Sequence, residues 1–499
     1  MIERISIFMT VVGLFASLVR GGILSSGDVI PDDPACWTTS TDAYVGETEA
    51  GAVTVDAASD VSSRNGHLGY QSGSTGTVTV SGAGSSWTNS QSLSVGSSGA
   101  GGLEVFDGGS VSNTSGYIGA DVGSSGLATV SGAGSTWSNS STLDIARSGG
   151  GWLYVSNGGL VSDTYGYIGY YGGADGGVSV SGADSTWSNS MDVHVGNDGR
   201  GALCVASGGA VSSRYGYIGY SSGSSGVASV SGAGATWANS IAVSAGFFGD
   251  GALRISNGGL VSNVYGYIAY DRDCSGAAAV RGDGSLWRNS NSLCIGYRGN
   301  GSLLIADGGL VTVSVELTID DDEDGDSFVY MGSGGMLALA GDVDDSLGAF
   351  LDLIGGSGAI RYWDESVWNW ADITGAAESV DYTLRHETVG DLAGFTVLEV
   401  IPSVPASMGD TNSDYIIDGR DLANLAAQFG GVPGDESADF NGDGRVGLED
   451  FAALRAHFGS GAASAPDAGR KAVIPEPGSS VVLLLGLGAV VRRGKRRSG

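Results

Sequence analysis

The sequence predicts a mainly β protein whose largest part is a right-handed, single-stranded parallel β-helix, followed by a small β cap and a small α-helical module. Three observations favour this fold class. Short apolar strands alternate with glycine-rich corners, and 89 of the 499 residues are glycine, against a usual share of about 7%. Hydrophobic residues still make up 41% of the chain, which is enough to build a core. A tryptophan recurs every 50 residues, at Trp87, Trp137, Trp187, Trp237 and Trp287.

Each 50-residue unit contains two coils. The apolar strand ends Val95, Ile118, Ile145 and Ile168 follow one another at steps of 23, 27 and 23 residues. Hairpin loops tolerate variation in length, whereas coils stacked on one another need a fixed residue count, so the constant spacing predicts a β-helix over residues 44–313. Eleven such coils would form a rod of roughly 50 Å, with these apolar residues stacked as an internal ladder.

The tryptophan ladder has two interpretations. Large aromatic side chains dominate protein cores, so each indole would fill a corner of the coil opposite valines such as Val111 and Val161. Alternatively, residues two coils apart lie roughly 9–10 Å from each other, a spacing that suits contacts to a glycan chain such as an exopolysaccharide. In that case the five tryptophans would be the glycan contacts.

The motifs of the repeat resemble a known family. Gly116–Gly119 reads GYIG and Ser131–Trp137 reads SGAGSTW, and both recur along residues 44–313. This pattern is similar to the repeat shared by PEP-CTERM proteins and autotransporter passenger domains. The resemblance implies a secreted β-solenoid and implies no chemistry.

The N-terminus predicts an export signal. An apolar run from Ile5 to Val19 follows Arg4 and is too short for a comfortable membrane span. A positive charge followed by a short apolar segment is typical of a secretory signal peptide. We therefore expect residues 1–22 to be a signal peptide and residues 23–43 to be a linker.

The C-terminus carries a second processing signal, in residues 474–499. Its parts are a PEP tripeptide, an uncharged apolar run and a cluster of basic residues that begins at Arg492 and Arg493. The tripeptide is Pro475, Glu476 and Pro477. This order resembles the PEP-CTERM sorting signal, which implies recognition by an exosortase. It also implies transient anchoring in the membrane before the tail is cleaved, with the arginines on the cytoplasmic side.

Residues 314–401 are expected to close the solenoid. The repeat fades after Val313, and a solenoid needs a cap over its last open coil. An aromatic cluster lies in this segment, at Tyr362, Trp363, Trp368 and Trp370. We expect them to form the core of a small β cap, and a carbohydrate platform is the alternative.

Two acidic loops predict a metal-binding module in residues 409–460, separated from the tail by a linker at 461–473. Each loop ends on an aspartate at its twelfth position and runs into an apolar helix face. Oxygen ligands at this spacing, with a backbone carbonyl at the seventh position, suit Ca²⁺. The expected ligands are Asp410, Asn412, Asp414, Ile416, Asp418 and Asp421 in the first loop and Asp439, Asn441, Asp443, Arg445 and Asp450 in the second.

This pair of loops resembles a type I dockerin. The resemblance implies that Ca²⁺ folds the module and that a cohesin-like domain is a candidate partner. The sixth loop position is Gly444 in the second loop but Tyr415 in the first. A non-glycine residue in the left-handed conformation costs about 1–2 kcal/mol, so we expect weaker calcium binding in the first loop.

Charge and cysteine usage narrow the classes of function. Asp and Glu number 54 against 23 Lys and Arg, which gives a formal net charge of −31. Such a surface repels phosphates, so nucleic acid is not expected as a partner. The four cysteines form no C-x-x-C pair, which leaves a zinc site or a thioredoxin-like motif without support.

The order of the parts predicts an exported, surface-anchored structural or adhesive protein of a bacterial envelope or extracellular matrix. We expect no enzymatic activity, because carboxylates and basic residues do not recur as a cluster along the repeat. Two alternatives remain. One is a polysaccharide lyase or glycoside hydrolase delivered through the dockerin-like module, and the other is a non-catalytic glycan-binding component.

Overall fold

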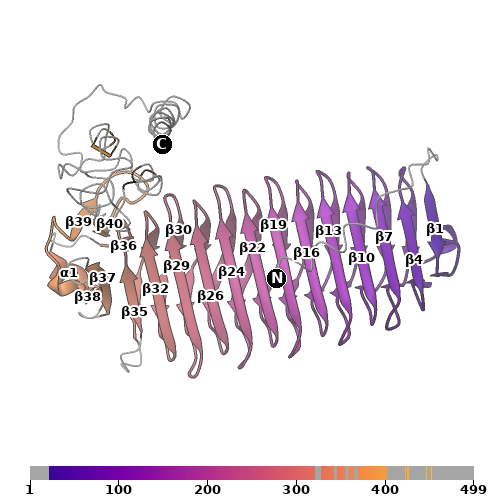
Figure 1. Ribbon diagram of the computed structural model, residues 1–499, viewed down its shortest axis with the longest axis horizontal. Helices are drawn as coiled ribbons and strands as arrows, with labels where there is room; N and C mark the ends of the chain where they lie inside the picture. Colours follow the sequence, from indigo (N-terminus) through magenta and orange to yellow (C-terminus); the bar gives the residue numbers. More distant parts are fainter. Residues whose placement is uncertain are drawn as a thin grey trace, which may run out of the picture. The chain divides into compact units, whose positions relative to one another are not determined.

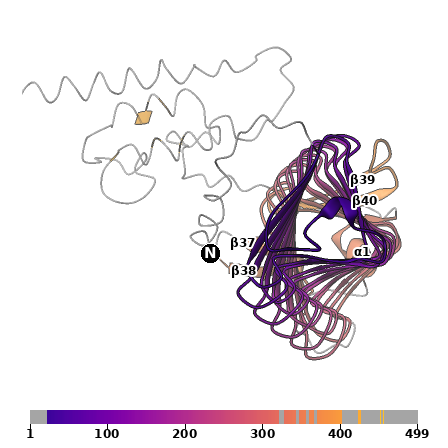
Figure 2. The same ribbon diagram turned by 90° about the vertical axis from the view of Figure 1, so that its right-hand side faces the viewer.

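The computed structural model describes residues 22–320, 327–341, 346–354, 359–364 and 369–401, together with Leu422, Asn424, Leu425, Val446, Phe451 and Leu454. The chain divides into two compact units, residues 1–401 and 402–499. The first unit is a β-solenoid of about 12 coils (Figure 1). Its coils superimpose when the solenoid is viewed along its long axis (Figure 2). The parallel β-solenoid predicted from the repeat is thus confirmed.

Each coil contributes one long strand to a 15-stranded sheet, and these strands are called the first series. They pair in parallel from β4 to β37. The first series comprises β4 (Ala50–Val55), β7 (Thr75–Ser81), β10 (Ala100–Phe106), β13 (Ser125–Ser131), β16 (Gly150–Ser156), β19 (Asp175–Ser181), β22 (Arg200–Ala206), β24 (Ser225–Ser231), β26 (Asp250–Ser256), β29 (Ser275–Arg281), β32 (Asn300–Ala306), β35 (Phe328–Met331) and β37 (Ile360–Asp364).

A 25-stranded sheet holds the remaining two strands of each coil. The second series comprises β5 (Asp60–Ser63), β8 (Ser86–Asn89), β11 (Ser110–Asn113), β14 (Thr136–Asn139), β17 (Leu160–Asp163), β20 (Thr186–Asn189), β27 (Leu260–Asn263), β30 (Leu286–Asn289), β33 (Leu310–Val313) and β36 (Met336–Ala340). The third series comprises β3 (Asp42–Val45), β6 (Asn65–Leu68), β9 (Ser92–Val95), β12 (Ser115–Ile118), β15 (Thr142–Ile145), β18 (Tyr165–Ile168), β21 (Asp192–Val195), β28 (Tyr265–Ile268), β31 (Ser292–Ile295) and β34 (Glu316–Ile319). Two continuous strands, β23 (Ala210–Ile218) and β25 (Thr236–Ala245), span both series.

The alternating step of 23 and 27 residues comes from corners whose lengths alternate from coil to coil. From β4 to β32 of the first series the register advances by a constant 25 residues, as from Val78 to Leu103 to Ala128. The corner from the third series back to the first is four residues long at 96–99 and six residues long at 119–124. The other corners compensate for this difference, so neighbouring coils remain in register.

The internal ladder predicted from the repeat is present. Val95, Ile118, Ile145 and Ile168 pair in register on consecutive coils, and all four side chains are fully buried. Alternate residues of each strand point inward, because successive side chains of a strand point to opposite faces. The core is therefore a continuous column of Val, Leu, Ile and Trp side chains.

Residues 23–43 are not a linker, and this prediction was wrong. Strand β1 (Ile23–Gly27) pairs antiparallel with β4, and β2 (Val29–Ile30) pairs antiparallel with β3. A short 3₁₀ helix, η2 (Pro34–Cys36), carries the chain to Trp37. The Trp37 ring lies 6.5 Å from the ring of Trp87 and is almost fully buried. The segment covers the apolar core that the first coil would otherwise expose, and this burial explains why it packs against the solenoid.

At the other end, the coils continue past residue 313, where the sequence repeat stops. Strands β34, β35 and β36 still pair in parallel with the preceding coil. Antiparallel pairing then ends the solenoid, through β38 (Asn369–Asp372) on β37, and β40 (Phe395–Val400) on both β36 and β39 (Tyr382–Glu387). The helices α1 (Leu347–Asp352) and η3 (Ile373–Gly375) contribute the buried Phe350 and Ile373.

Only six residues of the second unit are described. Leu422, Asn424, Leu425, Phe451 and Leu454 are helical. Leu425, Val446 and Leu454 are buried.

Candidate functional site

The five tryptophans of the ladder belong to the core. Each side chain is at most 1% exposed, so no indole face is open to a glycan and the glycan interpretation is wrong for these residues. Their position within the coil also differs from the prediction. Trp137 pairs in register with Val111 on one side and Val161 on the other, in the second series. The valines are therefore its neighbours along the stack and do not lie opposite it.

Glycines of the GYIG motif make room for the indoles. A Cβ atom added at Gly116 would lie 2.5 Å from Oδ1 of Asn139 and 3.0 Å from Cζ2 of Trp137. Gly66, Gly166, Gly216 and Gly266 have the same relation to the tryptophan of the following coil. The two-coil period thus reflects packing, because a coil with a large indole alternates with a coil that leaves space for it.

A polar ladder lies beside the indoles inside the solenoid. Trp137 Nε1 donates to Asn113 Oδ1 at 2.7 Å, and Asn113 Nδ2 donates to Asn139 Oδ1 at 2.5 Å. In the next unit an aspartate, Asp163, replaces Asn113. Burial raises the pKa of Asp163 to about 8, although the hydrogen bond from Trp187 opposes the rise. The group is therefore neutral over most of the pH range in which proteins are studied.

An aromatic stripe follows the outer side of the third series and the corner after it. Tyr220, Phe247, Tyr270 and Tyr297 stack in turn, with centroids 5.5, 4.7 and 5.1 Å apart and interplanar angles of 9°, 20° and 22°. Each ring covers a face of its neighbour, so the stripe lacks the open faces on which a sugar ring stacks. We interpret it as a stabilising ladder.

Two ionisable groups are built into this side of the solenoid. His194 is 6% exposed between the rings of Tyr167 and Tyr217, and desolvation lowers its pKa to about 4. Burial raises the pKa of Asp144 to about 6, opposed by the Arg147 guanidinium, whose Nε lies 3.6 Å from its carboxylate. Both groups are enclosed by neighbouring coils, which points to a structural role.

The opposite side of the solenoid offers an open aromatic face. On β16, Trp152 is 41% exposed and Tyr154 is 39% exposed, and both lie on the outer face of the 15-stranded sheet. A Cβ atom at Gly150 would lie 3.1 Å from the six-membered ring of Trp152, and one at Gly177 would lie 3.1 Å from its Cδ1. The indole therefore has a glycine on each of two sides, where any larger residue would contact the ring.

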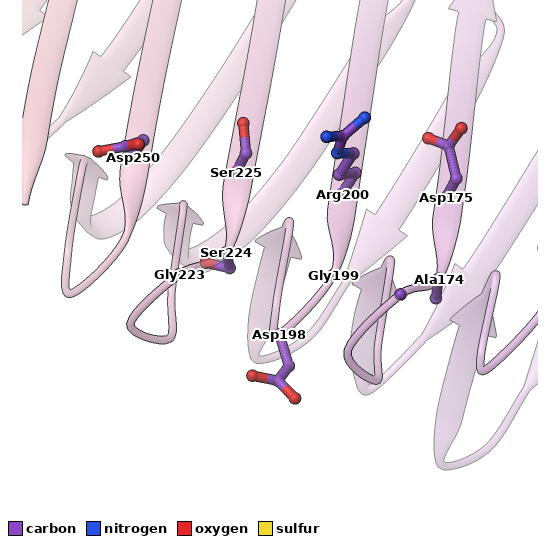
Figure 3. Close-up of a pocket in the computed structure, with 10 residues that line it drawn as sticks. Ala174, Asp175, Asp198, Gly199, Arg200, Gly223, Ser224, Ser225 and Asp250 are labelled. Carbon is purple, nitrogen blue, oxygen red and sulfur yellow. The ribbon is translucent and has the colours of Figure 1, made fainter.

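A shallow groove of about 490 Å³ lies along the same sheet, at the start of the strands that follow β16. Asp175, Arg200, Ser225 and Asp250 pair in register and form a row across β19, β22, β24 and β26 (Figure 3). Asp198 lies at the corner below the row. Within the described parts of the chain, no carboxylate oxygen lies within 4.0 Å of the Arg200 guanidinium.

The remaining predicted sites lie outside the described residues. They are the calcium ligands Asp410, Asn412, Asp414, Ile416, Asp418, Asp421, Asp439, Asn441, Asp443, Arg445 and Asp450, and the sorting-signal residues Pro475, Glu476, Pro477, Arg492 and Arg493. The predicted signal peptide is also outside them, except for Gly22. Among the residues that are described, no group of three His, Cys, Asp or Glu side chains could hold a metal ion. In the same residues, no helix is long and apolar enough to span a membrane.

The fold defines the chain as a β-solenoid protein. No family model matches the sequence, and neither a curated protein nor a solved structure is detectably similar to it.

The residues of the groove and of the open aromatic face were missed by the sequence analysis. They depart from the repeat, and this departure is the signal that could have found them. The position of Trp152 holds Gly102, Ala202 and Ala252 in other units, and the position of Arg200 holds Gly150. The positions that recur in every unit are mostly core residues, whereas the exposed side chains of the groove and of the aromatic face are found where one unit differs from the others.

Proposed function

We propose that this protein is an exported, surface-anchored structural or adhesive protein of a bacterial envelope or extracellular matrix. The solenoid serves as a stiff spacer, and a calcium-binding module separates it from the C-terminal anchor. The observation that carries the proposal is the uninterrupted parallel register from β4 to β35, which makes the described solenoid one continuous rod. A column of coils with a close-packed core resists bending, because each coil is packed on both neighbours.

The anchoring part of the proposal rests on the C-terminal sequence. The PEP tripeptide, the apolar run and the arginine cluster suit insertion followed by exosortase cleavage. The paired acidic loops at 409–460 suit Ca²⁺, which would stabilise a module too small to bury much core of its own. A cohesin-like domain or an exopolysaccharide is the partner that this layout favours.

Localisation tests this proposal. The intact chain and a chain ending at residue 473 are expressed in a host that has an exosortase, and cell-surface, membrane and medium fractions are compared. We expect the intact protein at the surface and the shortened protein in the medium. Equal distribution of the two would contradict surface anchoring through the tail. A variant with Arg492 and Arg493 replaced by Ala is the matched control for the basic cluster.

Glycan binding is the second candidate, and it is favoured by the exposed indole of Trp152. An enzyme that degrades polysaccharides is a further alternative. Incubation of the full chain with common polysaccharides, followed by an assay of reducing ends, separates these two functions. Sustained release of reducing ends would support the enzyme and contradict the purely structural function.

A further inference from the structure

We infer that the outer face of the 15-stranded sheet around Trp152 binds an extended, uncharged polysaccharide chain. The site consists of Trp152 and Tyr154 on β16 and the polar row on the strands that follow, formed by Asp175, Arg200, Ser225 and Asp250. This inference deepens the adhesive function proposed above by naming its ligand class.

The indole of Trp152 is presented as a platform. Gly150 and Gly177 lie beneath it, and a side chain at either position would come within 3.1 Å of the ring. Because these two positions carry no side chain, the ring of Trp152 is uncovered on those sides, and 41% of the residue is exposed. A pyranose ring has an apolar face of C–H groups that packs on such an aromatic surface.

The polar row supplies the second half of the chemistry. Sugar hydroxyls donate to carboxylates and accept from guanidinium groups, and the row offers both kinds of partner on neighbouring strands (Figure 3). The Arg200 guanidinium has no carboxylate oxygen within 4.0 Å in the described chain, so its donors are available to a ligand. Small-molecule sites usually combine aromatic or apolar surface with a few precisely placed polar groups.

The charges of the groove indicate an uncharged ligand. Asp175, Asp198 and Asp250 outnumber Arg200, and the whole chain carries a net charge of −31. A polysaccharide that bears carboxylates or sulfates would be repelled by this surface. A neutral glycan pays no such cost.

The dimensions of the site indicate a chain of several sugars. Consecutive strands of a sheet are about 4.8 Å apart, so the row from β19 to β26 extends over roughly 14 Å along the solenoid axis. Trp152 lies on β16, one strand before the row. A single sugar would reach only one end of this site, whereas an oligosaccharide that runs along the axis would contact both the indole and the guanidinium.

Calorimetric titration of the full chain tests the inference. The probes are hexamers of β-1,4-linked glucose, β-1,3-linked glucose and β-1,4-linked xylose, with polygalacturonate as the anionic probe. We expect at least one neutral hexamer to bind and polygalacturonate to bind more weakly. Trp152→Ala should weaken binding by at least about tenfold, which corresponds to loss of one stacking contact. Arg200→Ala should weaken it as well.

Two further variants separate the platform from a general effect of mutation. Gly177→Ala keeps the indole but adds a methyl group beneath it, so it should also weaken binding. Tyr265→Ala removes a ring that is 37% exposed on β28, in the third series, and should leave binding unchanged. Circular dichroism and thermal melting verify that every variant is folded.

The inference is overturned if no neutral hexamer binds at millimolar concentration, if Trp152→Ala binds as tightly as the natural chain, or if polygalacturonate is the preferred probe. Dimerisation through this face, detected by light scattering and abolished by Trp152→Ala, would also overturn it, since a second chain would then be the occupant. None of these results affects the localisation experiment, so the failure of one proposal is distinguishable from failure of the other.

Discussion

The indole nitrogen of Trp187 donates a hydrogen bond of 2.7 Å to Oδ2 of Asp163, and both side chains are buried inside the solenoid. In other units, Asn113 and Asn263 accept the equivalent hydrogen bond from Trp137 and Trp287. In the four units other than that of Asp163, the side chain at the equivalent position also donates a hydrogen bond to the asparagine of the following coil. These donors are Ser63, Asn113, Ser213 and Asn263.

An ionised Asp163 cannot make that second bond, because a carboxylate has no proton to donate. Both Asp163 Oδ1 and Asn189 Oδ1 are buried without a partner. A protonated Asp163 would supply the missing donor to Asn189, which agrees with its raised pKa of about 8. The aspartate therefore functions as a neutral acid in the core.

The first prediction concerns the pH dependence that Asp163 creates. Its pKa is about 8 in the folded chain against 3.8 for an ordinary aspartate, so the folded state binds the proton more tightly. Its contribution to stability is complete below pH 3.8 and is lost as the pH rises toward 8, at a cost of a few kcal/mol. Asp163→Asn should remove this loss, and thermal melting across the pH range measures it. Asp175→Asn, at an exposed position, is the control, and equal pH profiles for Asp163→Asn and the natural chain would refute the prediction.

A second pH effect of opposite sign is expected from His194. Desolvation lowers its pKa to about 4, from 6.5, so the folded state resists protonation and stability is lost as the pH falls from 6.5 toward 4. The groups facing it are the rings of Tyr167, Tyr217 and Tyr220. His194→Ser introduces the residue that Ser244 provides at the equivalent position.

This variant should flatten the acid side of the melting profile even if lost packing lowers its melting temperature overall. In the double variant with Asp163→Asn, these two positions should make almost no pH-dependent contribution to the free energy of unfolding between pH 4 and 6.5. An acid limb that survives His194→Ser unchanged would show that another group is responsible.

The third prediction concerns the packing of glycine against tryptophan. Gly116→Ala places a methyl group 2.5 Å from Asn139 Oδ1 and 2.8 Å from Leu143 Cδ1, inside a core that cannot yield. We expect a loss of about 1–3 kcal/mol or more, measured by denaturant unfolding. Gly102→Ala is the matched control, since it meets only a side-chain methyl of Thr77 at 3.3 Å on the outer face. The control should be neutral or stabilising, and similar losses at both positions would contradict the packing argument.

The fourth prediction concerns calcium. If residues 409–460 hold two Ca²⁺ ions as the ligand spacing predicts, calorimetry of the full chain should resolve a tighter and a weaker site. Asp439→Ala should abolish the tighter site and Asp410→Ala the weaker one. Tyr415→Gly relieves the left-handed position of the first loop and should raise its affinity, by about 1–2 kcal/mol at most. A first loop that binds more tightly than the second would contradict the assignment.

Much of the fold follows from the spacing of residues along the chain. The ladder of Val95, Ile118, Ile145 and Ile168 could be predicted because a constant coil length leaves no other way to stack equivalent residues. The cap over the first coil could not be predicted in the same way. Residues 23–43 contain no repeat, and Trp37 becomes a core residue only because the first coil would otherwise expose Trp87.

The candidate site was hidden by the same regularity. Trp152 and Leu153 are both apolar, so the alternating pattern of β16 taken alone does not say which of them points inward. Comparison between units does, because Leu153 recurs in the repeat and Trp152 does not. The recurring Trp87 series attracted the glycan interpretation although its members are buried. Trp152, the residue that differs from its equivalents, proved to be the exposed one.

The sequence by itself determined the coiled architecture, because a fixed residue count per coil is a local constraint that can be read along one dimension. Only the tertiary structure decided which aromatic rings are exposed to water and which carboxylates are buried. Those properties depend on side chains brought together from consecutive coils about 25 residues apart, such as Asp163 beneath Trp187 or Trp152 over Gly177. Desolvation and exposure arise from the closed stack as a whole, so no single unit of the repeat contains them.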